Sequence, residues 1–105
     1  MPRSLWSLVI GIFCSTSMLG ATEAADLENG RRIAERWCVD CHAVNRTQKS
    51  ANTEAPPFSG IARRPAFDAG MLALFLLHPH PKMPDIGLSR DAASDLAAYI
   101  ARQRE

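Results

Sequence analysis

The side chains best placed to do chemistry lie in one short stretch, where two cysteines are separated by two residues and a histidine follows directly. These residues are Cys38, Cys41 and His42. Two thiols at this spacing can each add to a vinyl group of a haem, while the adjacent imidazole reaches the iron. The motif therefore predicts one covalently attached haem c, with Cys38 and Cys41 as the attachment points and His42 as an axial iron ligand.

Two other kinds of site also use closely spaced cysteines. A thiol redox pair would follow a strand within a βαβ pattern, and the residues around the motif show no strand alternation. A zinc site would need two of His42, His78 and His80 beside the thiols. His78 and His80 are only two residues apart across a proline, closer than the usual spacing of a ligand pair. Haem attachment is the favoured interpretation, and thiol or zinc chemistry is the alternative.

The net charge of the chain limits its partners. The 105 residues carry 12 Lys and Arg against 11 Asp and Glu, so no excess charge favours binding to nucleic acid or to an anionic membrane.

The N-terminal segment indicates the compartment. Residues 1–24 have the order of a cleaved secretory signal peptide: a basic start, a short apolar run that includes Cys14, then small residues. That run is well short of the roughly 20 residues that span a bilayer. The sequence predicts a mature periplasmic domain of residues 25–105; an uncleaved N-terminal anchor is the alternative.

Apolar periodicity predicts three helices, over residues 26–37, 67–77 and 90–104. Ser89 is a favourable N-cap for the last of them. The helix over 67–77 is apolar on nearly every side, so we expect it to be buried or to cover something large and apolar. Residues 44–54 are polar without periodicity and are expected to form a solvated loop. A domain this small needs more than its own side chains to complete a core, and a haem would supply the difference.

Residues outside the motif extend the pattern along the chain. Gly30 lies in the first predicted helix, Leu96 and Tyr99 lie in the last, and Met83 lies in a proline-rich loop before it. In these features the chain resembles the class I c-type cytochromes, whose N-terminal helix carries a Gly and crosses a C-terminal helix bearing an aromatic residue. The resemblance covers nearly the whole mature region. It implies an all-α cytochrome c fold of three to four short helices around one haem, with Met83 as second axial ligand.

The same resemblance implies a haem environment after the motif. The family has a Pro, an apolar residue, a Gly and then an Arg, and this order is matched by Pro56, Phe58, Gly60 and Arg64. By analogy, the carbonyl of Pro56 accepts the second ring N–H of His42, and Pro57 is the alternative acceptor because the double proline leaves the register open by one residue.

Three further residues are assigned to this environment. Phe58 and Ile61 are expected to cover a haem face, which largely coincides with ordinary core packing. Arg64 is expected to contact a haem propionate, since a guanidinium suits a carboxylate. The alternative for Arg64 is that it forms only a solvated pair with Arg63.

Residue chemistry supports Met83 as the second ligand. A thioether is a soft, neutral ligand that favours ferrous iron and raises the reduction potential, and the prolines on both sides of Met83 restrict its loop. The rival Met71 lies in an apolar helical run, where a Met usually fills core space. His78 and His80 are expected to be exposed loop imidazoles.

A haem iron with two protein ligands has no open position for substrate. The sequence therefore predicts a periplasmic one-electron carrier rather than an enzyme, a monomer in a respiratory chain. Its donor would be a dehydrogenase or quinol-oxidising complex, and its acceptor an oxidase or reductase. The alternatives are a haem subunit permanently associated with one oxidoreductase, or a ligand-binding or peroxidatic haem protein if Met83 is not a ligand.

Overall fold

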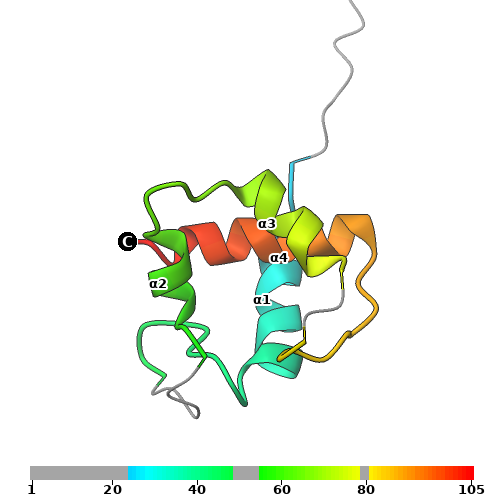
Figure 1. Cartoon of the computed structure of the whole chain (residues 1–105). Helices are drawn as coiled ribbons and strands as arrows, with labels where there is room; N and C mark the ends of the chain where they lie inside the picture. Colours follow the sequence, from blue (N-terminus) through cyan, green and yellow to red (C-terminus); the bar gives the residue numbers. More distant parts are fainter. Residues whose placement is uncertain (1–23, 49–54, 79–80) are drawn as a thin grey trace, which may run out of the picture.

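The fold consists of short helices joined by loops (Figure 1). The computed structural model describes residues 24–48, 55–78 and 81–105, so the predicted signal peptide lies outside it except for Ala24. The elements in chain order are α1 (Leu27–Ile33), the π-helical turn η1 (Ala34–Cys38), α2 (Phe58–Ala62), α3 (Ala69–Leu76) and α4 (Arg90–Arg102). The described residues contain no β-strand, which confirms the all-α class. No helix among them has the length and apolar character needed to cross a bilayer.

The predicted first helix is confirmed as α1 continued by η1. It begins after Asp26, whose carboxylate accepts a hydrogen bond of 3.0 Å from the backbone N–H of Asn29. The chain then widens into the π-helical turn, which ends at Cys38. Such turns often occur at functional sites. The first cysteine of the motif therefore sits at the end of a helix rather than in a free loop.

The last helix also forms as predicted, and it crosses α1 at close range (Figure 1). Ser89 caps α4 by accepting a hydrogen bond of 3.1 Å from the N–H of Ala92. At the crossing, a Cβ atom on Gly30 would lie 2.2 Å from the carbonyl oxygen of Asp95 and 2.8 Å from the Cβ of Tyr99. The two helices can approach this closely only because residue 30 has no side chain.

We expect Gly30→Ala to lower the free energy of unfolding of the haem-loaded protein by about 3 kcal/mol or more, since overpacking against backbone forces two helices apart. Denaturant unfolding followed by circular dichroism measures this loss. Gly70→Ala is the matched control, because its Cβ would meet only the end of the Asp68 side chain, at 3.2 Å. The control should stay within about 1 kcal/mol of the parent, the size of the helix-propensity gain. Equal losses in the two variants would contradict a tight crossing at Gly30.

The segment after the motif differs from the predicted solvated loop. Val44 is completely buried, and its carbonyl accepts a hydrogen bond of 2.8 Å from the buried hydroxyl of Tyr99 on α4. Burial raises the pKa of Tyr99, so the hydroxyl stays protonated and able to donate to higher pH than an exposed tyrosine. The prediction of a solvated loop is therefore wrong at Val44, and residues 49–54 lie outside the described part of the chain.

Helix α2 was not among the three helices predicted by periodicity. It begins directly after Pro57, whose backbone is extended with φ −63° and ψ 151°. Five residues are too few to show a 3.6-residue period. Within this helix Phe58 and Ala62 are buried, so α2 contributes to the core despite its length.

Helix α3 forms close to the predicted bounds, but it is not a buried helix. Met71, Leu74 and Phe75 are 67%, 55% and 48% exposed. Leu72 and Leu76, one turn apart, pack against the core from the other side. A helix that packs on one side against α4 leaves side chains such as Met71 and Leu74 exposed on the opposite side, whatever its composition. The expectation of burial is wrong for this side, and Met71 does not fill the core.

The core that these helices build is small. The described residues include ten buried apolar side chains, five of them Ala: Ala34, Ala43, Val44, Phe58, Ala62, Ala93, Leu96, Ala97, Tyr99 and Ile100. Among residues 24–48, 55–78 and 81–105, the largest side chains with almost no exposure are Leu96, Ile100 and Val44. Several larger apolar side chains surround a hollow instead of closing on one another.

Candidate functional site

The hollow is a cavity of about 460 Å³ between the motif, α2, α3, α4 and the loop before α4. Its volume lies within the range of about 300–1,000 Å³ typical of small-molecule and cofactor sites. All eight predicted site residues line it: Cys38, Cys41, His42, Pro56, Phe58, Ile61, Arg64 and Met83. The tertiary structure thus brings into one cavity residues that are up to 45 positions apart in the chain (83 − 38).

The two cysteines enter the cavity from the end of η1. The backbone N–H groups of Cys41 and His42 donate to the carbonyl of Cys38, at 3.2 and 2.9 Å, which turns the chain back on itself. Both cysteines are unpaired; Cys38 is partly buried and Cys41 is exposed. Burial, with a smaller contribution from Cys41, raises the pKa of Cys38 to about 11. Reactive redox pairs depend on a lowered thiol pKa, so the site does not favour the thiol redox alternative.

The zinc alternative also finds no geometric support. Among residues 24–48, 55–78 and 81–105, no three His, Cys, Asp or Glu side chains gather closely enough to hold a metal ion. His78 is exposed and its Nδ1 donates to the carbonyl of Leu74, 2.8 Å away at the end of α3. His80 lies outside the described residues. His78 is therefore an exposed imidazole, as expected.

His42 is oriented by a hydrogen bond to the chain that precedes α2. Its Nδ1–H donates to the carbonyl of Pro56 over 2.6 Å, so the acceptor is Pro56 and not Pro57. A second link runs beside it, since the N–H of Phe58 donates to the carbonyl of Ala43 at 2.9 Å. A ring with a protonated Nδ1 leaves the lone pair of Nε2 available for a metal. This is the tautomer that iron ligation requires.

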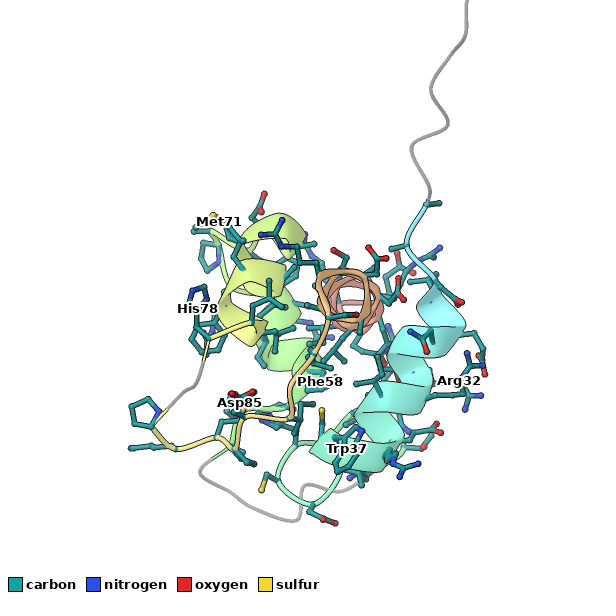
Figure 2. All side chains as sticks on the ribbon, turned by 90° about the vertical axis from the view of Figure 1, so that its right-hand side faces the viewer. Arg32, Trp37, Phe58, Met71, His78 and Asp85 are labelled. Atoms are coloured by element: carbon teal, nitrogen blue, oxygen red, sulfur yellow. The ribbon has the colours of Figure 1, made fainter. Side chains whose placement is uncertain are left out.

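Phe58 connects the histidine to the core. Its ring centroid lies 5.4 Å from that of His42 and 6.4 Å from that of Tyr99, and the side chain is only 3% exposed. Figure 2 shows Phe58 in the interior, between the ribbons of α1 and α3. It therefore buttresses the imidazole and also forms part of the cavity wall.

Met83 reaches the same cavity from the loop before α4. It is partly buried, and its neighbours Lys82 and Pro84 also line the cavity. Met71 does not line it; Figure 2 shows Met71 and His78 on the outer side of α3, away from Phe58. Met83 therefore lines the cavity beside the motif, whereas Met71 does not.

The neighbouring side chains of Arg63 and Arg64 have different surroundings. Arg64 is exposed and lines the cavity. The Nε of Arg63 instead donates to the carbonyl of Arg104, 3.2 Å away at the end of α4. Arg64 thus has a position suited to an anionic edge of a ligand, and both arginines are exposed.

The cavity is also lined by residues that the sequence analysis did not assign to the site. Apolar side chains complete most of the wall: Trp37, Ala55, Leu72, Phe75, Leu76, Ile86, Leu96 and Ile100. The sequence shows that Leu72 and Leu76 on α3, and Leu96 and Ile100 on α4, are four residues apart and so share a helix face. Spacing alone does not show whether such a face packs in the core or contacts a ligand. An apolar wall with two thiols, an imidazole and a thioether fits a covalently held haem. Helix α3 was expected either to be buried or to cover something large and apolar, and three of its apolar side chains line this cavity.

Comparison with known proteins extends over nearly the whole chain. The sequence is 46% identical to cytochrome c-552 of Bradyrhizobium diazoefficiens over 97 residues, which are 92% of this chain and 90% of that protein. A match of this length in a chain of 105 residues must include the region from Cys38 to Met83. No family profile and no solved structure matches the chain.

Proposed function

The chain belongs to the monohaem cytochrome c family, and from this premise we propose that it is a periplasmic one-electron carrier whose haem iron is bound by His42 and Met83. One observation carries the proposal: both thiols, the imidazole and the thioether line a single apolar cavity. When bound, the haem supplies a metal that changes reversibly between ferrous and ferric states.

Different residues of the chain would attach, ligate and shield the haem. Cys38 and Cys41 would attach it through thioether bonds, and His42 would bind through Nε2 with its other nitrogen held by Pro56. The Met83 sulfur would favour the ferrous state and raise the reduction potential. Phe58 and Leu96, both nearly completely buried, would keep water from the interior of the cavity.

Transfer of an electron, rather than chemistry on a substrate, follows from this arrangement. With His42 and Met83 as axial ligands, no coordination position would remain for a substrate. Trp37 and Cys41 line the cavity and are both exposed, so one edge of the group would lie close to the surface. Electrons would pass between protein partners through such an edge.

We place the carrier between a dehydrogenase or quinol-oxidising complex as donor and an oxidase or reductase as acceptor. It would act as a monomer after removal of residues 1–24. Arg64 and Lys82 line the cavity and would give its rim positive charge. Partner docking would then weaken as salt concentration rises.

The decisive experiment is expression with the haem-attachment machinery, followed by a mass measurement and a denatured haem spectrum of the mature chain. The expected mass is that of residues 25–105 plus one haem. A mass equal to the bare polypeptide, or in native conditions to polypeptide plus zinc, would reject the proposal. Reduction and oxidation rates with candidate partners, measured across ionic strength, would then identify donor and acceptor.

One observation favours a second function, a haem subunit permanently associated with one oxidoreductase. Met71 and Leu74 on α3 are more than half exposed and lie outside the cavity, so a bound haem would not cover them. Residues 69–81 contain no Asp, Glu, Lys or Arg. Exposed apolar surface of this kind can mark a stable protein interface. Gel filtration of a gentle native extract distinguishes the functions: a free carrier elutes at the size of one small domain, and a subunit elutes with its complex.

A further inference from the structure

The side chain of Gln48 reaches back to the haem-attachment motif and makes three hydrogen bonds there. Its Nε2 donates to the carbonyl of Val39 at 2.9 Å and to the carbonyl of His42 at 3.2 Å. Its Oε1 accepts from the N–H of Val44 at 3.2 Å. Both amide hydrogens and the amide oxygen are thus used on the motif and the residues that follow it.

The backbone of the motif needs these partners because a helical turn ends there. At the end of this turn, the carbonyl of Cys38 accepts from the N–H groups of Cys41 and His42. Within the described part of the chain, no backbone N–H donates to the carbonyl of Val39 or of His42. Helix ends leave such carbonyls without partners unless a side chain or water supplies them. The amide of Gln48 supplies both.

The bonds of Gln48 also connect the motif to a rigid part of the molecule. Val44 is completely buried and its carbonyl is held by the Tyr99 hydroxyl. Gln48 bonds the N–H of the same residue. His42 is therefore held from two directions: its ring by Pro56 and its main-chain carbonyl by Gln48.

We propose that Gln48 is a positioning residue for the haem-attachment motif, and that it sets the orientation of the His42 imidazole by fixing the main chain on both sides of Cys41. The inference rests on the proposed function, because it takes His42 as an iron ligand. Gln48 does not line the cavity, so it acts only through the backbone that it holds.

The test compares the holoproteins of Gln48→Leu and Gln48→Glu with the parent. Gln48→Leu removes all three hydrogen bonds, and Gln48→Glu keeps the size and the acceptor but loses both N–H donors at neutral pH. The haem-methyl NMR shifts of the ferric protein report the orientation of the axial imidazole plane. The rate at which the low-spin ferric spectrum is lost in acid reports how firmly the histidine is held.

We expect both variants to change the haem-methyl shift pattern at neutral pH, and Gln48→Leu to lose the low-spin spectrum about tenfold faster than the parent, the effect of leaving partly buried carbonyls without donors. The matched control is Gln103→Leu, which removes a comparable bond from Nε2 to the carbonyl of Tyr99, 3.3 Å long and away from the cavity. It should leave the shift pattern and the acid rate unchanged.

Each outcome decides between the inference and its alternatives. Parent-like shifts and acid rates in both variants would overturn the role of Gln48 while leaving the proposed function intact. A parent-like shift pattern in Gln48→Glu beside an altered one in Gln48→Leu would overturn it in favour of simple packing. If Gln48→Leu fails to acquire haem, Gln48→Glu still decides the question. A parent protein without covalent haem would overturn both the inference and the proposed function.

Discussion

Replacing Cys38 and Cys41 together by Ala should give a chain that carries no covalent haem and shows no cooperative unfolding transition. The two thiols are the proposed attachment points, and both line the cavity. Without them the protein would have to keep this cavity empty, fill it with water or collapse into it. We expect the tertiary structure to be lost.

The size of the cavity relative to the core is the physical reason. Half of the ten buried apolar side chains in the described part of the chain are Ala, while the cavity measures about 460 Å³. At the roughly 24 cal/mol that each Å³ of empty core costs, a dry void of this volume would cost up to about 11 kcal/mol. The whole stability of a small domain is about 5–15 kcal/mol. The haem-free polypeptide is therefore expected to have a free energy of unfolding close to zero.

Near-ultraviolet circular dichroism and a thermal melt of the Cys38→Ala/Cys41→Ala variant measure this effect. Cys14→Ala is the control, because Cys14 belongs to the predicted signal peptide and should be absent from the mature protein. That variant should give a mature protein with the mass, haem content and melting curve of the parent. A cooperative melt of the haem-free double variant would count strongly against a core completed by haem.

Met83→Ala should leave the sixth coordination position of the haem iron without a protein ligand. The ferrous parent protein is expected to bind carbon monoxide slowly or not at all, because Met83 holds the sixth position. The variant should bind it rapidly. Loss of the thioether should also lower the reduction potential by on the order of 0.1 V, within the roughly 0.8 V range over which axial ligands set haem potentials.

Flash photolysis with carbon monoxide and a redox titration measure the two effects. Met71→Ala is the matched control, since Met71 is 67% exposed and lies outside the cavity. It should leave the spectrum, the potential and carbon monoxide binding unchanged. Rapid binding of carbon monoxide by the parent, or a parent-like potential in Met83→Ala, would show that Met83 is not the ligand. Either result would favour the ligand-binding or peroxidatic alternative.

The sequence alone was most informative where chemistry or structure depends on residues close together in the chain. The spacing of Cys38, Cys41 and His42 indicated the attachment site, because thioether formation and iron ligation need those groups within a few residues. Ser89 indicated the start of α4 through a bond to a residue three positions away. The glycine that lets α1 cross α4 followed from the resemblance to a family, not from local pattern.

Contacts between distant residues needed the tertiary structure. The burial of Val44 in a polar stretch depends on Tyr99, 55 positions later. The choice of Pro56 over Pro57 depends on where the His42 ring lies, and the exposed side of α3 depends on which of its faces meets α4.

The same division holds for the two arginines and for Gln48. Arg63 and Arg64 are indistinguishable in the sequence, yet only Arg64 lines the cavity, because Arg63 reaches the end of α4. Gln48 belongs to a stretch without periodicity, and its three hydrogen bonds exist only because the chain folds back on the motif. Spacing along the sequence determined which groups could hold a haem. The packing of distant segments decided how those groups are oriented, because orientation depends on partners that no local pattern specifies.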